Sequence, residues 1–179
     1  MTLPHDAVEL PPAVDHSFAA LLAAVFVVLS FLVGCDPQKV SELEEDISTE
    51  ADVRSRFGEP ADVYMEPNGD RTLEYPRQPA GHANYMITIG RNGKMTSLRQ
   101  VLNSANLAKV VPGLDRDQVR RMLGRPAKVQ AYSLKEEEVW DWRFADGPEI
   151  KIFSVTFDKS GQVVSTGITL DPKELGQRG

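Results

Sequence analysis

Cysteine is nearly absent from this chain, because Cys35 is the only one among 179 residues. A lone thiol cannot form an internal disulfide, a zinc tetrad or a Cys-x-x-Cys redox pair, so these sites are excluded. Histidine is scarce, with three residues, and the sequence has no Gly-x-Ser-x-Gly elbow, His-Glu-x-x-His helix, Walker loop or dinucleotide-binding glycine cluster. We therefore expect a protein that is not an enzyme and that holds no metal and no cofactor.

Charge is missing from a long stretch near the N-terminus. No charged residue falls between Asp15 and Asp36, and residues 18–33 are almost wholly apolar. This run is short for a membrane-spanning helix and fits the core of a signal peptide. Residues 1–34 contain no Lys or Arg, which a signal peptide normally carries at its start. The sequence thus predicts a signal peptide over residues 1–34 with an atypical N-terminal extension.

The apolar run ends in a pattern that resembles the lipobox of bacterial lipoproteins. Leu32, Val33 and Gly34 lead directly into Cys35. The pattern predicts cleavage after Gly34 and attachment of lipid, including palmitate, to Cys35, whereas the alternative is a buried thiol at the end of an uncleaved anchor. Two or more acyl chains hold a protein stably on a bilayer. The expected membrane partner is therefore reached through a covalent lipid.

Removal of residues 1–34 also changes the charge of the chain. These residues carry three carboxylates and no cation, so the formal net charge changes from −6 to −3. Such a mildly acidic body suggests no nucleic-acid partner. A charged stretch from Lys39 to Ile47 follows a very short tether and is expected to be helical.

One segment of the remaining chain occurs twice. Residues 53–61 read V-R-S-R-F-G-E-P-A, and residues 119–127 read V-R-R-M-L-G-R-P-A. In each copy the Val and the apolar residue four positions later mark one helix face, the Gly ends the helix, and the Pro turns the chain away. Thr49 and Asp115 precede the helices as capping residues. The segment predicts two helix-to-strand corners.

Similar strands follow both corners. Residues 72–77 and 139–144 predict an aromatic strand, and residues 85–94 and 153–162 predict a further strand ending in a glycine turn. Another strand is expected before a short helix that opens the second half. We predict an α+β fold built from a duplicated unit, with the first copy over residues 35–102, the second over residues 103–171 and a polar tail over residues 172–179. The alternating aromatic residues of the second copy are expected to form its core.

Two groups of residues form the candidate partner surface. The first is the loop 76–83 with its flank, including Tyr75, Arg77 and His82. The second is a set of arginines on the second repeated helix: Arg116, Arg120 and Arg121. These arginines suit an acidic partner or anionic lipid, although exposed arginines are more often only solvated. A lone loop histidine is usually solvated, so we expect no metal site or catalytic site at His82.

The lipobox, the repeated corner and the glycine-turn hairpins together resemble the BamE (SmpA/OmlA) lipoproteins. The best local matches are residues 102–126 and residues 75–82. Members of this family are accessory subunits of the machinery that inserts β-barrels into the outer membrane. The resemblance implies helix-helix-three-strand units, here in tandem, with the helices on one face of an antiparallel sheet. It also implies a non-catalytic scaffold on the periplasmic side of the outer membrane, with barrel-assembly subunits as partners and no small-molecule substrate.

Two alternatives stay open. Asp36 directly after the predicted lipidated residue resembles an inner-membrane retention signal, so the inner membrane is the second location. Tandem copies of this fold also resemble the β-lactamase inhibitor protein, which grips an enzyme. That second interpretation predicts exposed aromatic side chains on a concave sheet face.

Overall fold

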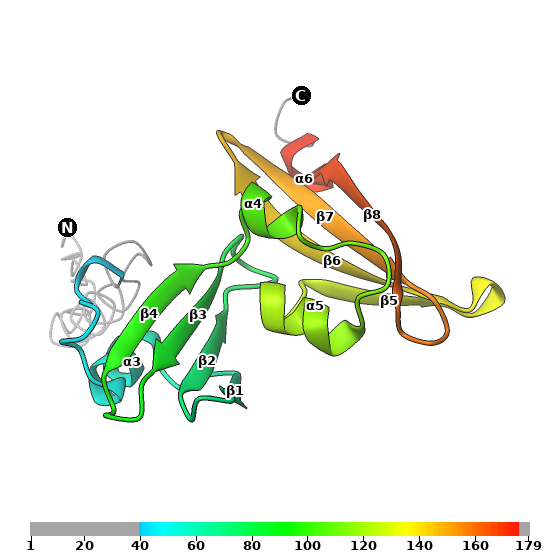
Figure 1. The fold of residues 1–179 in the computed structure, drawn as a ribbon. Coiled ribbons are helices and arrows are strands. Elements are labelled where there is room, and N and C mark those ends of the chain that lie inside the picture. Colours follow the sequence, from blue (N-terminus) through cyan, green and yellow to red (C-terminus); the bar gives the residue numbers. More distant parts are fainter. Residues whose placement is uncertain (1–39, 176–179) are drawn as a thin grey trace, which may run out of the picture. The chain divides into compact units, whose positions relative to one another are not determined.

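The computed structural model describes residues 40–175 (Figure 1). The predicted signal peptide and its lipobox at Leu32, Val33, Gly34 and Cys35 lie outside these residues and stay predictions. The described residues form two four-stranded antiparallel sheets with short helices. The predicted α+β class is confirmed.

The first sheet follows one capped helix. In chain order the elements are α3 (Glu50–Phe57), β1 (Asp62–Met65), β2 (Arg71–Pro76), β3 (Asn84–Ile89) and β4 (Met95–Gln100), and the sheet order is β1-β2-β3-β4. A capping box between Thr49 and Asp52 starts α3, and Gly58 ends it with a φ of 83°. Val53 and Phe57 point from α3 into a core on one face of the sheet.

The strands of the second sheet follow one another in chain order, as in the first sheet, and more helices accompany them. Its elements are α4 (Ser104–Leu107), α5 (Arg116–Leu123), β5 (Lys128–Tyr132), the 3-10 turn η1 (Ser133–Lys135), β6 (Glu137–Asp146), β7 (Glu149–Phe157), β8 (Val163–Leu170) and α6 (Pro172–Leu175), with the sheet order β5-β6-β7-β8. A capping box between Asp115 and Gln118 starts α5, and Gly124 ends it with a φ of 74°. Both predicted corners are thus present; that the two units are copies of one ancestor stays a prediction.

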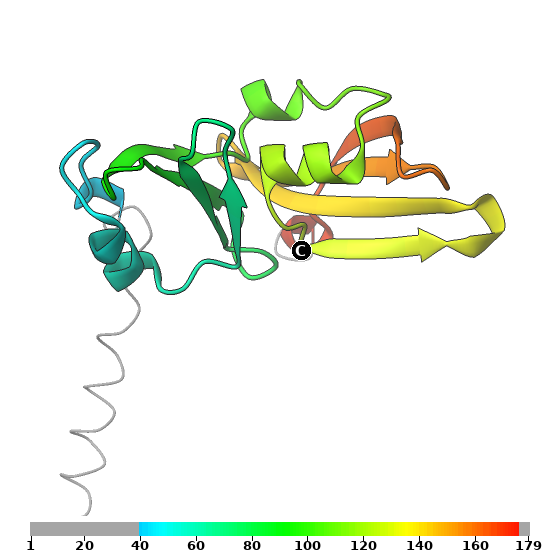
Figure 2. The same ribbon diagram turned by 60° about the horizontal axis from the view of Figure 1, so that its bottom comes forward.

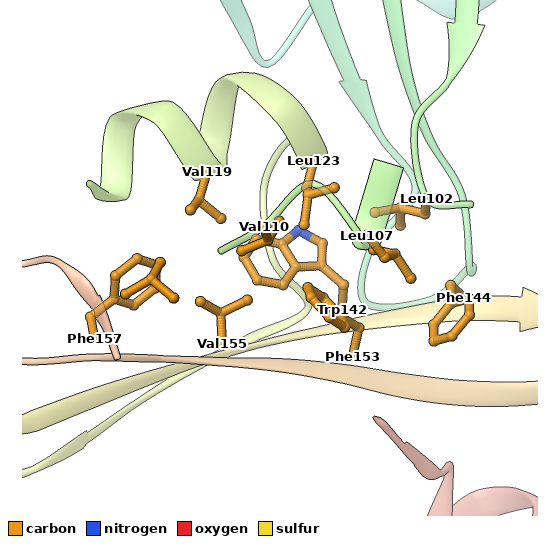
Figure 3. Packing of buried hydrophobic residues seen from close by; sticks show 11 residues of the cluster. Leu102, Leu107, Val110, Val119, Leu123, Trp142, Phe144, Phe153, Val155 and Phe157 are labelled. Carbon is orange, nitrogen blue, oxygen red and sulfur yellow. The ribbon is translucent and has the colours of Figure 1, made fainter. Parts of the chain in front are cut away.

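The core of the second sheet lies under α4 and α5, which cover one face of β5–β8 (Figures 1 and 2). Trp142 is fully buried beneath Leu123 and Val119, and its indole N–H donates to the Gly124 carbonyl at 2.9 Å (Figure 3). The predicted role of the β6 and β7 aromatics in the core is confirmed. Those that are almost fully buried are Trp142, Phe144, Phe153 and Phe157.

Two details of the predicted units are wrong. Each sheet has four strands instead of the predicted three, and the strands that were not predicted are β1 and β5. Both are edge strands, and β5 is exposed along its whole length, so neither shows the alternating burial that marks a strand in a sequence. Residues 42–48 form turns instead of a helix. Ser48 accepts a hydrogen bond from the Glu44 N–H at 2.9 Å, which offers the backbone an alternative to a helix.

The end of α5 packs against the face of the first sheet that α3 leaves uncovered. Asn84 on β3 is fully buried, and its side-chain amide donates to the carbonyl oxygens of Leu123 at 2.7 Å and Arg125 at 3.0 Å. A Cβ added to Gly124 would lie 2.9 Å from that amide nitrogen. The second corner therefore fits closely over Asn84, whereas Gly58 at the first corner has no atom within 4 Å of such a Cβ.

A buried carboxylate completes this junction. Glu74 on β2 is fully buried and accepts hydrogen bonds from the Arg125 N–H at 2.8 Å and the Tyr64 hydroxyl at 2.5 Å. The guanidinium of Arg120 lies 3.3 Å from the same carboxylate. A buried charge is tolerated only when it is paired and hydrogen-bonded in this way. Arg120 and Arg125 belong to the second unit, so the two sheets depend on each other.

The two corner glycines provide a matched test of the junction. Gly58→Ala places a side chain at positive φ without a clash and should cost about 1 kcal/mol in free energy of unfolding. Gly124→Ala adds a clash with an amide held by two buried hydrogen bonds, so we expect a cost of about 2 to 3 kcal/mol. Urea denaturation of the two variants measures the difference. Equal costs would show that the Asn84 side chain moves away without loss of stability and that the close contact between Gly124 and Asn84 does not contribute to the free energy of unfolding.

A second matched pair tests the ion pair. Arg54 and Arg120 occupy the same place in the two repeated segments, but Arg54 pairs with Glu50 and Glu59 on the surface of α3. Arg120→Met leaves a buried carboxylate without its cation and should lower the free energy of unfolding by about 2 to 4 kcal/mol. Arg54→Met removes a pair with the half-buried Glu50, which keeps Arg71 as a partner, and a pair with the exposed Glu59, so it should cost less than about 1 kcal/mol. Chemical denaturation distinguishes these outcomes, and similar small losses would contradict a structural role for Glu74.

Candidate functional site

Tyr75, predicted as part of a partner surface, is a core residue. It is 1% exposed and its ring centroid lies 5.2 Å from that of Phe57. Within residues 40–175 its buried hydroxyl has no hydrogen-bond partner. Burial raises the pKa of Tyr75 to about 12. The prediction that Tyr75 contacts a partner is therefore wrong. Its side chain lies on the face of β2 that α3 covers, and the sequence did not show which face of the sheet that would be.

The loop after Tyr75 contacts the second sheet. The guanidinium of Arg77 lies 5.1 Å from the ring centroid of Phe57, and Arg77 is half-buried. The Gln78 side chain donates to the backbone carbonyl of Arg143 on β6 at 2.7 Å, and the Arg143 guanidinium donates to the Pro79 carbonyl at 3.1 Å. His82 is exposed. Much of the loop thus joins the two sheets. Of the three residues predicted here as a partner surface, Tyr75, Arg77 and His82, the one that is exposed to solvent is His82.

The three predicted arginines have different surroundings. Arg116 donates to Glu138 at 2.9 Å and lies over the Phe157 ring at 5.5 Å. Arg120 is engaged with Glu74. Arg121 is exposed and lies 4.8 Å from the ring centroid of Tyr64. Two of the three arginines predicted to face a partner, Arg116 and Arg120, are thus paired with carboxylates of the described chain, and Arg121 is the one whose charge stays open to a partner.

A cleft opens beside Arg121. It encloses about 200 Å³ and lies between the second face of the first sheet and the helices α4 and α5. Its walls come from β1, β2, β3, β4 and both helices, and its lining residues are Tyr64, Glu66, Thr72, Met86, Arg99, Val101, Asn106, Lys109, Arg121 and Met122. This is the candidate functional site.

Three cations from three different elements meet in this cleft. They are Arg99 on β4, Lys109 just after α4, and Arg121 on α5, and all three are exposed. Sequence reasoning found only Arg121. Arg99 and Lys109 are isolated charges on separate elements, so no local pattern marks them, and only the docking of α5 on the first sheet brings them together.

Carboxylates lie in and beside the cleft. Glu66 lines the cleft itself and, with Asp70, an adjoining hollow that Arg99 shares, and Asp62 and Asp117 line another hollow that Arg120 and Arg121 share. The site therefore holds charges of both signs. Its floor consists of apolar lining residues: Met86 and Val101, which are buried, and Met122, which is partly exposed. These groups can pair with charges of both signs and cover an apolar side chain.

The Tyr64 hydroxyl connects the cleft to the buried junction. It donates to Glu74, and burial together with this hydrogen bond to the carboxylate raises the pKa of Tyr64. The phenol is thus held neutral and in place at the edge of the cleft. Within residues 40–175, no group of three or more His, Cys, Asp or Glu side chains is arranged to hold a metal ion. No helix in the same part of the chain is long and apolar enough to cross a membrane.

Comparison with known protein families gives a match within the second unit. Residues 100–167 match the family model of the "Outer membrane protein assembly factor BamE domain". This second unit is BamE-like. The match agrees with the family resemblance read from the sequence. It spans α4 to β8, less than half of the chain, so the BamE-like unit supplies Lys109 and Arg121 to the cleft and the first sheet supplies Arg99.

Solved structures give weaker similarities. A putative osmotically inducible lipoprotein, OsmE, is 26% identical over 44% of this chain and 82% of its own, with a TM-score of 0.35. A DUF4309 family protein, YjgB, from Bacillus subtilis is 17% identical over 72% and 82%, with a TM-score of 0.29. A putative β-lactamase inhibitor protein from Streptococcus mutans is 14% identical over 69% and 84%, with a TM-score of 0.33. Among curated proteins, no match was found.

Substitution of Tyr75 tests its place in the core. Since its hydroxyl is buried and has no hydrogen-bond partner in the described part of the chain, Tyr75→Phe should leave the free energy of unfolding at neutral pH unchanged or slightly higher. Its folded pKa is raised from 10.0 to about 12, so the unfolded chain loses this proton first. The free energy of unfolding should therefore decline as the pH rises from 10 to 12, and it should decline less in Tyr75→Phe than in the unaltered chain.

Denaturation curves across this pH range provide the measurement, with Tyr132→Phe as the control for loss of an exposed phenol. A pH dependence that is unchanged in Tyr75→Phe would contradict the burial of this hydroxyl.

Proposed function

We propose that the chain is a lipid-anchored, non-catalytic accessory factor in the assembly of outer-membrane β-barrel proteins. The observation that carries this proposal is the match of residues 100–167 to the outer membrane protein assembly factor BamE domain. The matched family is one of assembly factors and not of enzymes. The proposed site of action is the periplasmic side of the outer membrane, with barrel-assembly subunits as protein partners.

The cleft supports a binding role for this body. A sheet and two helices set the backbone positions of its charged residues, and a site whose backbone is already in place binds with a smaller loss of conformational entropy. Because both units contribute to its walls, the proposed accessory role belongs to the tandem body and not to the BamE-like unit alone.

The inhibitor interpretation receives less support from the described surface. It predicts exposed aromatics on a sheet face, yet among residues 40–175 the exposed large apolar side chains include one aromatic, Tyr132, at the end of β5. The aromatics of β6 and β7 point instead into the core under α4 and α5 (Figure 3). We therefore advance the assembly role alone.

The lipid anchor is tested by metabolic labelling with palmitate. We expect the full chain to incorporate label and to fractionate with membranes, and Cys35→Ser to lose both properties because the predicted attachment thiol is gone. Cys35 is the only cysteine, so no other thiol can replace it. Label that persists in Cys35→Ser would rule out the proposed lipid attachment.

The assembly role is tested by purification of the tagged full chain from detergent-solubilised envelopes. We expect barrel-assembly subunits to copurify, and to do so less with Cys35→Ser, which is not held at the membrane. Separation of outer and inner membranes on a density gradient decides the location. Recovery of a soluble hydrolase in place of assembly subunits would overturn the proposal and favour the inhibitor interpretation.

A further inference from the structure

The cleft holds positive charge that no acidic group of the described chain neutralises. Within residues 40–175, the guanidinium of Arg99 has neither a hydrogen bond nor an ion pair. The guanidinium of Arg121 has no ion pair there either and lies over the ring of Tyr64. The Lys109 ammonium donates to the neutral amide oxygen of Asn106 at 2.9 Å. Three cations around one recess repel each other, so an anionic group placed between them would be stabilised by all three.

The walls of the cleft restrict the kind of anion that fits. Glu66 and Asp117 form no ion pair among the described residues. Glu66 stands with Asp70 in a hollow beside Arg99, and Asp117 stands in a hollow beside Arg121 with Asp62, which pairs with Arg120 at 3.7 Å. A continuous anionic surface, such as an acidic bilayer, would bring negative charge against these carboxylates. A single acidic group at the centre would avoid them, and basic groups on either side of it would pair with them.

The floor adds a second requirement. Met86 and Val101 are nearly fully buried at the bottom of the cleft, and Met122 lines it from α5. Methionine side chains adapt to different apolar shapes. A ligand that carries an apolar side chain next to its acidic group would therefore cover the exposed part of Met122, as a polypeptide can do and an inorganic anion cannot.

We propose that this cleft binds a segment of a partner protein that has acidic residues at its centre and a basic residue on each side. The inference rests on the proposed accessory function and names the chemistry of the partner. Arg99, Lys109 and Arg121 would pair with the central carboxylates, and Glu66 and Asp117 would pair with the flanking cations. Both units are needed, since Arg99 comes from the first sheet and the other two cations from the BamE-like unit.

Two fluorescent peptides of identical composition test the charge pattern. One ten-residue probe has two glutamates beside an apolar residue at its centre and a lysine toward each end; the other exchanges the positions of glutamates and lysines. Both have a net charge of zero, so non-specific attraction is the same for each. Anisotropy titration of the full chain in detergent should show at least about tenfold tighter binding of the first probe, weakening with salt.

Variants locate the binding. Arg99→Gln, Lys109→Gln and Arg121→Gln together should remove the preference between the two probes. The matched control combines Lys128→Gln, Lys135→Gln and Lys159→Gln, which removes three exposed cations that do not line the cleft and should keep the preference. All six positions are exposed, so circular dichroism should show that both variants are folded.

Equal binding of the two probes, or a preference that survives in the cleft variant, would overturn the proposal. Vesicles with anionic phospholipid form a further arm, tested with Cys35→Ser so that the lipid anchor does not contribute. Vesicle binding that is lost in the cleft variant, without any peptide preference, would replace the proposed partner with a membrane. Failure of the assembly role is seen separately, as the absence of barrel-assembly subunits from the purified envelope complex.

Discussion

The buried carboxylate of Glu74 is the constraint on which the rest of the described structure depends. It lies inside the first sheet, yet two of its three donors, the Arg120 guanidinium and the Arg125 N–H, come from the second unit. The third, the Tyr64 hydroxyl, comes from the edge strand β1 of the same sheet. An ionised carboxylate without such partners would cost several kcal/mol in a buried position. The first sheet can therefore bury Glu74 only when the corner after α5 is seated on it. Asn84 sets the distance of that contact, because its amide reaches two carbonyls around Gly124.

This junction also creates the candidate site. Seating the end of α5 on the first sheet places Arg121 and Met122 opposite Arg99 and Met86, and the space between them is the cleft. A single unit has no such opposing wall. The tandem arrangement thus provides a binding feature that the BamE-like residues 100–167 do not contain by themselves. The loop around Gln78 and its contacts with Arg143 hold the same two sheets together at a second place.

Sequence reasoning predicted what is encoded locally. The spacing of Val119, Leu123 and Gly124 specifies a capped helix and a corner, and both copies have that geometry. It failed where a residue's role depends on the other unit. Glu74 and Asn84 are polar residues within or beside apolar strands, a pattern that normally marks the solvent-facing side of a strand. Arg120 looks like a surface residue in the sequence because its partner, the carboxylate of Glu74, is 46 positions away. Edge strands were missed since exposure on both faces leaves no alternation.

Hydrogen exchange under native conditions tests most directly whether the two sheets form one cooperative body. We expect the central amides of β2 and β3 to exchange with the same free energy of opening as those of β6 and β7, because neither sheet keeps its polar junction satisfied alone. Each unit is also small for independent stability. In Glu74→Gln the two sets should separate, with the first sheet opening more readily. If the first sheet already opens independently in the unaltered chain, the junction does not unite the sheets and the account is wrong.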